Sequence, residues 1–218
     1  MFICVVTPLM LMLLLLKKRS KLINGYLVIG IFASLFISEL NSILLSYFNN
    51  DTFFVTTTIT PVTEEIIKAL PIFFYAYVIS DDLERLMPIA FSTGIGFAFF
   101  ENMVVVLKYT SNIQLPLAIA RGVSTALMHA VCTAAVGIGM SFVRKKKEFF
   151  YCGTFGLLML AILYHGMFNL LVQSQFAFVG YAIPVLTYIP LVVRQYKYSK
   201  NKNDKGDINE KQAVQAHS

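Results

Sequence analysis

Tryptophan is absent from this sequence, and charged residues are scarce. Only 14% of the 218 residues are charged, whereas 57% are hydrophobic. A soluble domain carries about 25% charged residues, so this chain lies well outside the usual range. Its mean hydropathy of +0.68 agrees with that composition. The lack of charge excludes an ordinary soluble protein and predicts an integral membrane protein.

Cysteines and the common soluble-enzyme motifs are also few. Cys4, Cys132 and Cys152 are far apart and lie in or beside apolar runs. They match neither a disulfide framework nor the spacing of a metal site. The sequence contains no HExxH motif, no glycine-rich phosphate loop and no internal repeat. These absences leave the apolar runs as the main source of structural information.

Seven apolar runs predict an all-α transmembrane bundle of about seven spans. They cover residues 2–16, 22–45, 59–79, 87–107, 115–143, 149–172 and 176–193. Most are long enough to cross a bilayer as helices. Basic residues follow the first run and none precedes it, so we expect a retained helix with its N-terminus outside rather than a signal peptide. We expect one membrane domain, 1–193, and a disordered cytoplasmic tail, 194–218.

The basic residues lie almost entirely on one side of this predicted topology. Fifteen of the 18 Lys and Arg residues fall in the loops or tail assigned to the cytoplasm. Lys108 lies in an outside loop, and Lys68 and Arg121 lie within spans. This asymmetry follows the positive-inside rule. It predicts a multi-pass protein of the cell membrane. The basic residues would then lie at the surface of the lipid bilayer, and we expect no nucleic-acid partner.

Several ionisable residues lie within the apolar runs at a similar predicted depth. A charge near the bilayer centre costs roughly 2.5 to 3.5 kcal/mol, so such residues usually pair or mark function. Counting from the outer ends of the spans places most of them in the outer half of the membrane. We therefore predict one shared polar site, and keep Glu39 out of it as an interhelical contact. The ionisable residues within the runs are Glu39, which is kept out, and the members of the predicted site, namely Glu64, Glu65, Glu101, the deeper His129, and His165.

Each of these residues also has a purely structural interpretation. Glu64 and Glu65 follow Thr60 and Pro61, a plausible N-cap and first helical residue, so they would then only complement the helix dipole. Lys68, four residues after Glu64, would be its ion-pair partner. A single membrane histidine often serves as a hydrogen-bond donor between helices. The recurrence of such residues on several spans favours the shared site.

Small residues beside the predicted site indicate that its helices approach closely. Ala126, Ala130 and Ala134 form a stripe at helical spacing next to His129, and Gly94 and Gly96 precede Glu101. Small side chains let the backbones of membrane helices come near each other. This packing would bring side chains from separate spans within reach.

Four ordered motifs resemble those of the PrsW family of intramembrane proteases. They are EEIIK at 64–68, GFAFFEN at 96–102, Arg121 eight residues before His129, and HGMFN at 165–169. The resemblance covers about 61–171. The same larger group contains CAAX prenyl endopeptidases and bacteriocin-immunity-type membrane proteases. Asn169 resembles the CAAX-type variant at its position, whereas Glu101 stands where CAAX-type members carry histidine and favours PrsW.

The resemblance implies a glutamic peptidase with a defined set of site residues. Glu64 is our choice of general base, with Glu65 second. His129 would hold the water, and Glu101 would orient His129 or share a proton with the glutamates. His165 and Asn169 would donate hydrogen bonds to the developing oxyanion. Lys68, Phe97, Asn102 and Arg121 would support these groups.

A metal-dependent version uses the same residues in other roles. His129, His165 and Glu101 would hold zinc, with Glu64 as the base. We favour the version without a cofactor, because no HExxH motif is present and the three ligands would come from separate helices.

The resemblance also implies a substrate, namely a single-pass membrane protein such as an anti-sigma factor. The outer-half site suits cleavage near the extracytoplasmic face, and the resemblance implies that this is a first cleavage, at site 1. Two other classes stay open, besides a CAAX-type or immunity-type protease. A proton-coupled transporter would spread polar residues across both membrane halves, and a non-catalytic scaffold would keep the fold without activity.

Overall fold

The computed structural model describes residues 20–109, 115–190 and 192–193. Within these ranges the chain is helical and contains no strand, which confirms the predicted all-α class. The described residues up to 184 form one compact unit, and the described residues from 185 onward are assigned to a second. The predicted first span, 2–16, and the predicted tail, 194–218, lie outside the described residues.

The helices of the first unit follow one another with short connections. The long ones are α2 (Ser20–Tyr47), α5 (Leu83–Tyr109), α6 (Leu115–Met140) and α8 (Gly156–Val172). Helix α4 (Thr60–Phe74) lies between the π-helical turns η1 (Val55–Ile59) and η2 (Tyr75–Ile79). Short helices α3 (Thr52–Phe54) and α7 (Lys147–Phe149) precede η1 and η3 (Phe150–Phe155). A further apolar helix covers Ala177–Pro190.

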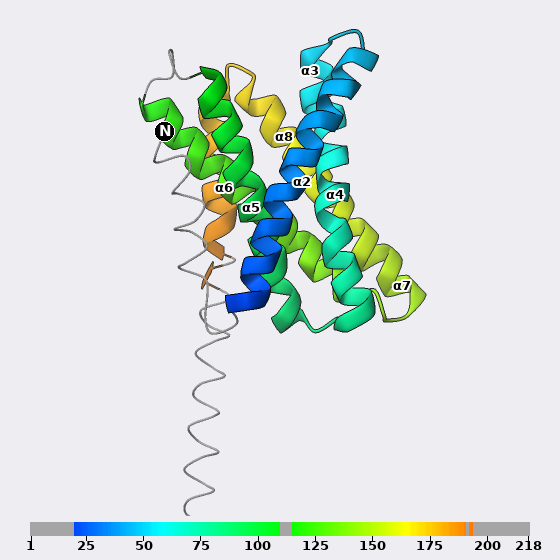
Figure 1. The fold of residues 1–218 in the computed structure, drawn as a ribbon. Helices are drawn as coiled ribbons and strands as arrows, with labels where there is room; N and C mark the ends of the chain where they lie inside the picture. Colours follow the sequence, from blue (N-terminus) through cyan, green and yellow to red (C-terminus); the bar gives the residue numbers. More distant parts are fainter. Residues whose placement is uncertain (1–19, 110–114, 191, 194–218) are drawn as a thin grey trace, which may run out of the picture. The chain divides into compact units, whose positions relative to one another are not determined.

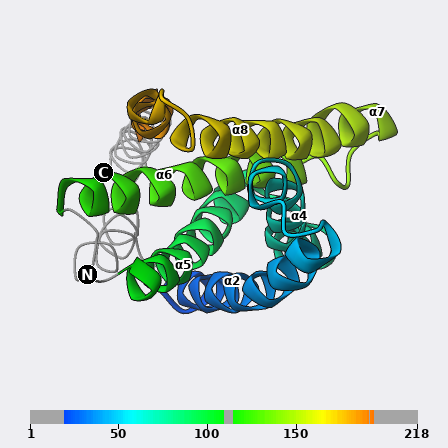
Figure 2. The same ribbon diagram turned by 90° about the horizontal axis from the view of Figure 1, so that it is seen from above.

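Helix α4 packs against each of the other long helices through one of its faces, while its opposite face is exposed. It contacts α2, α5, α6 and α8. Seen from above, α4 stands between α2 and α8, with α5 and α6 closing the group (Figure 2). Figure 1 shows α2 crossing in front of α5, and the two helices are in extensive contact. A side chain on the inner face of α4 can therefore meet residues from several helices at once.

Four helices are long and apolar enough to cross a membrane. They are Lys21–Tyr47, Leu83–Leu107, Ala118–Met140 and Lys147–Val172. They coincide with the second, fourth, fifth and sixth predicted spans. The third, 59–79, is helical throughout but carries two glutamates and a lysine, and it is not among these four. The full count of seven spans and the orientation of the termini stay predictions.

The outer face of α2 is mainly apolar, as expected for a helix in contact with lipid. Glu39 is exposed on this face, so the expected interhelical contact of Glu39 is not supported. Phe32, Phe36 and Ile43 are exposed, whereas Ile23 and Ile37 are buried. Exposed aromatic and aliphatic side chains over a whole helix face would be a liability in water. In a bilayer this surface needs no cover, because lipid tails solvate it.

Helix α4 does not begin afresh at Thr60. The residue before it, Ile59, has αR geometry, and the helical run extends back through η1 and α3. The N-terminal start of this run is capped by Asp51, whose Oδ1 accepts a hydrogen bond from the backbone N–H of Phe54 at 3.0 Å. The interpretation of Thr60 as an N-cap was therefore wrong, and Glu64 lies far from the helix terminus. A helix dipole does not explain its burial.

Close approach of α5 and α6 depends on Gly94. A Cβ at this position would lie within 2.6 Å of the carbonyl oxygen of His129 and would also overlap the hydroxyl of Thr133. Ala126, Ala130 and Ala134 are all buried. The prediction that small residues allow tight packing beside His129 is confirmed. The fold thus holds the backbone of His129 directly against α5.

We predict that Gly94→Ala destabilises the protein, because the added methyl group must push α5 away from α6. Overpacking of this kind costs roughly 1 to 3 kcal/mol. Gly25→Ala is the matched control, since a Cβ at Gly25 meets nothing within 4 Å. Thermal unfolding of the purified proteins in detergent measures the difference. Equal melting temperatures for the two variants would contradict the close-packing argument.

Candidate active site

Three charged residues of α4 point into the bundle. Glu64, Glu65 and Lys68 are 5%, 0% and 0% exposed, so the helix face that they occupy is completely covered by its neighbours. Positions four apart lie on the same face of a helix, which places Glu64 and Lys68 together. Burial of three ionisable side chains is costly unless each finds a partner. The contacts of this cluster follow from that requirement.

Lys68 is held by groups from three helices. Its Nζ lies 2.6 Å from Glu65 Oε1 and 2.8 Å from His129 Nδ1, and 4.7 Å from the centre of the Phe97 ring. An ammonium has three N–H donors, and here it meets two acceptors and one aromatic face. The expected pairing of Lys68 with Glu64 is thus replaced by pairing with Glu65. Helices α4, α5 and α6 are joined at this one nitrogen.

His129 is engaged through both ring nitrogens. Nδ1 faces the Lys68 ammonium, which can only donate, so Nδ1 must be the acceptor. Nε2 then carries the proton and donates to Glu101 Oε2 at 2.6 Å. Phe97 packs on the imidazole with ring centres 4.9 Å apart. The expected role of Glu101 in orienting His129 agrees with this geometry.

Glu101 and Arg121 form the exposed edge of the cluster. Arg121 Nη2 lies 3.4 Å from Glu101 Oε1, and both side chains are about 30% exposed. His129, on the other side of Glu101, is fully buried. The one carboxylate thus connects a partly exposed guanidinium with a buried imidazole.

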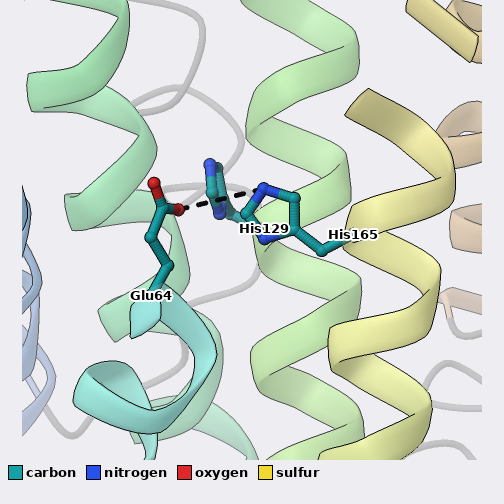
Figure 3. A group of neighbouring side chains, drawn as sticks. All are labelled: Glu64, His129 and His165. Atoms are coloured by element: carbon teal, nitrogen blue, oxygen red, sulfur yellow. Dashed lines mark ion pairs between the residues drawn. The ribbon is translucent and has the colours of Figure 1, made fainter. Parts of the chain in front are cut away.

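His165 of α8 lies between the two glutamates. Its Nδ1 is 2.8 Å from Glu65 Oε1, while its Nε2 is 3.9 Å from Glu64 Oε2, too long for a hydrogen bond. Figure 3 shows Glu64, His129 and His165 converging from α4, α6 and α8. The buried Glu64 Oε2 has no hydrogen-bond partner among the described residues. Glu65 Oε2 is also buried without a partner among these residues, but Glu65 is held through Oε1 by Lys68 and His165. Glu64 is therefore the less restrained of the two carboxylates.

The two predicted asparagines lie outside this convergence. Asn169 Nδ2 donates to the carbonyl oxygen of Thr56 in η1 at 2.8 Å. Asn102 Nδ2 donates to the carbonyl oxygen of Gly122 at 3.4 Å. The expected role of Asn169 as an oxyanion donor is not supported by this contact, because its amide already holds η1 against α8. Both asparagines join backbones of neighbouring helices.

The residues present fit a metal ion, with one change from the expected ligand set. Glu64, His129 and His165 each offer one ligand atom, and these atoms all lie within 4.8 Å of one another. Two imidazoles and one carboxylate are a common donor set for catalytic zinc. The partnerless Glu64 Oε2 supports the fit. Glu64 takes the position expected for Glu101, whose Oε2 is bonded to His129 Nε2 instead.

Comparison with known proteins identifies the family. A family model described as PrsW family intramembrane metalloprotease matches residues 18–194. The chain belongs to the PrsW family of intramembrane proteases. A curated relative, Protease PrsW from Clostridioides difficile (strain 630), is 24% identical over 193 residues, which cover 83% of this chain and 77% of the relative. No solved structure matches the chain.

Two further polar residues of this PrsW-family protease were not found from the sequence. Thr125 lies one turn from both Arg121 and His129 on α6, is 2% exposed, and its hydroxyl has no hydrogen-bond partner among the described residues. Its spacing of four from each neighbour was the available signal. Gln173 bonds to Thr56 Oγ1 and completes the contact between η1 and α8. No spacing rule connects residues so distant in the chain.

We predict that Glu65→Ala strongly destabilises the PrsW-family protease. It leaves the Lys68 ammonium and the Nδ1 of His165 without their shared acceptor, and removal of one partner of a buried ion pair costs roughly 3 to 5 kcal/mol. Thermal unfolding in detergent is the measurement, with Glu39→Ala on the exposed face of α2 as control. The double variant Glu65→Ala/Lys68→Met should recover part of the loss. A Glu65→Ala protein as stable as the control would contradict the assigned pairing.

Proposed function

We propose that this PrsW-family protease is a multi-pass protein of the cell membrane that hydrolyses a peptide bond in a single-pass membrane protein. The proposed substrate is an anti-sigma factor, cut at site 1 near the extracytoplasmic face. Membership of the family supports the hydrolase activity. The substrate proposal rests on the resemblance and on the predicted depth of the acidic residues in the outer half of the membrane.

The observation that carries the mechanism is the free oxygen of Glu64. Every other ionisable side chain of the buried cluster is tied by at least one contact of 2.8 Å or less, and this includes Glu65, although its Oε2 is also without a partner. Glu64 makes no such contact in the described part of the chain, and its Oε2 lies 3.9 Å from His165 Nε2. A general base must be within hydrogen-bond reach of the proton that it takes. We therefore assign Glu64 as the base that holds the attacking water, and Glu65 as the residue that fixes Lys68 and His165.

The proposed reaction is a metal-free addition and elimination. Glu64 takes a proton from water as the water oxygen bonds to the scissile carbonyl carbon. When His165 carries both protons, Glu65 holds Nδ1–H, and Nε2–H is left to stabilise the carbonyl oxygen as it becomes negative. The Glu64 carboxyl then gives its proton to the leaving nitrogen as the carbon–nitrogen bond breaks. Glu64 returns to its starting ionisation state.

The metal-dependent alternative uses the same site with a different occupant. Glu64, His129 and His165 would hold the ion. When bound, a zinc ion supplies an activated water and polarises the carbonyl group. In both versions Glu65 fixes His165 through Nδ1, and Glu101 fixes His129 through Nε2. The versions differ in whether His165 Nε2 carries a proton or serves as a ligand.

We predict that Glu64→Gln and Glu65→Gln fail in different ways. Glu64→Gln should lower cleavage of a co-expressed single-pass substrate by about 100-fold or more, within the range of general-base losses, with little loss of stability. Glu65→Gln should lower both cleavage and the melting temperature, because Glu65 Oε1 accepts from Lys68 and His165. Immunoblots of substrate fragments and detergent melting curves measure the two effects.

Glu39→Gln, on the exposed face of α2, is the matched control and should cleave like the wild type. Wild-type cleavage by stably inserted Glu64→Gln would remove Glu64 from the mechanism. If His129→Ala and His165→Ala also cleaved normally, the protease assignment of this cluster would fail as a whole.

A further inference from the structure

We propose that Lys68 competes with a divalent metal ion for His129, so that the ion enters the Glu64–His129–His165 group only when the Lys68 ammonium moves away. This inference rests on the active site proposed above, but it does not depend on cleavage. It makes Lys68 the residue that decides whether this site works with or without a metal. The argument follows from the hydrogen bonds of His129 and Lys68.

Lys68 occupies a complete cation site built by other side chains. Its ammonium meets the carboxylate of Glu65, the Nδ1 of His129 and the ring of Phe97. The side chain is fully buried, so no water replaces any of these partners. Three donors with three acceptors leave the ammonium fully satisfied. The site therefore already contains one bound positive charge.

A neutral imidazole has one lone pair for a metal ion, and in His129 this lone pair is in use. Lys68 can only donate, so the lone pair at Nδ1 accepts the Lys68 N–H bond at 2.8 Å. The Nε2–H bond to Glu101, at 2.6 Å, uses the other nitrogen. Zinc binds a histidine nitrogen at about 2.0 to 2.1 Å. An ion at Nδ1 would therefore take the place of the Lys68 hydrogen bond.

The remaining contacts of the two histidines resemble the surroundings of metal ligands. A metal-bound histidine usually donates its other N–H to a carboxylate, which fixes the tautomer and the ring orientation. Glu101 does this for His129, and Glu65 does it for His165. The lone pair at His165 Nε2 faces Glu64 Oε2. Lys68 is thus the one group of the cluster that opposes a metal ion at His129.

Electrostatics acts in the same direction as the hydrogen bonds. A divalent cation beside a buried ammonium is repelled strongly, because the interior screens charge far less than water does. Removal of the ammonium would also leave the negative charge of Glu65 to favour a cation. Two ligands that exclude each other lower each other's affinity by the same factor. Loss of the lysine charge should therefore raise the affinity for zinc.

The test measures zinc binding directly, in the absence of substrate. The full-length protein is purified in detergent with a tag that contains no histidine, stripped with a chelator, and titrated with zinc chloride by calorimetry. Lys68→Met keeps the length of the side chain but removes every donor. Lys21→Met, at the exposed start of α2, removes the same charge far from the cluster and is the matched control. Lys68→Met/His129→Ala tests whether the gained affinity uses His129.

We expect Lys68→Met to bind zinc at least about tenfold more tightly than the wild type, a typical coupling between linked sites. Lys21→Met should match the wild type, and Lys68→Met/His129→Ala should lose the gain. An affinity of Lys68→Met within about twofold of the wild type, or weaker, would overturn the proposal. A gain that survives the loss of His129 would also overturn it.

Two further points keep the outcome decisive. If Lys68→Met does not fold, Glu65→Gln/Lys68→Met removes the ion pair as a unit, and the same zinc criteria apply to it against Glu65→Gln alone. Because the titration contains no substrate, its result is independent of the cleavage assay. If Lys68→Met gains zinc affinity but the wild type does not cleave substrate, only the proposed protease mechanism is refuted. If the wild type cleaves substrate but Lys68→Met gains no zinc affinity, only this inference is refuted.

Discussion

The buried ammonium of Lys68 is the constraint on which the arrangement of the site depends. In an apolar medium it must find three partners, and it finds them on α4, α5 and α6. Glu65 extends the connection to α8 through His165. Four helices are thus held in one register by a single charge and its neighbours. Apolar contacts between the helices would fix this register less strongly, because lipid tails are as apolar as leucine and can replace such contacts.

From this centre the polar groups form a continuous series of contacts with two different ends. In one direction Lys68 leads through His129 and Glu101 to Arg121, which is partly exposed. In the other direction Glu65 and His165 lead to Glu64, whose Oε2 is buried and has no hydrogen-bond partner among the described residues. A fully satisfied network rigidifies its members, whereas a free oxygen is available for chemistry. Glu65 Oε2 is also without a partner, but Glu65 is fixed through Oε1, so the proposed base, Glu64, is the carboxylate that the network restrains least.

The distinction between a glutamic and a metal-dependent protease concerns two nitrogen atoms. In the two proposed versions, His129 Nδ1 would bind either Lys68, as in this structure, or an ion, and His165 Nε2 would carry either a proton or an ion. The carboxylates that hold the opposite nitrogens, Glu101 and Glu65, serve both versions equally. Under the proposed competition, a small change in the position of Lys68 would be enough to exchange one version for the other. The close contact of α5 and α6 at Gly94 keeps His129 in place in either case.

The sequence alone determined the membrane class, the helical runs and the family, because apolar length, basic asymmetry and four ordered motifs are local properties of the chain. It also identified Glu64, Glu65, Glu101, His129 and His165, since charge within an apolar run is conspicuous. Only the tertiary structure decided the partners. Spacing on α4 allowed Lys68 to pair with either glutamate, and the positions of His129 and His165 favoured Glu65. The contact of Asn169 with Thr56 likewise could not be predicted from the sequence, because it joins helices that are far apart along the chain.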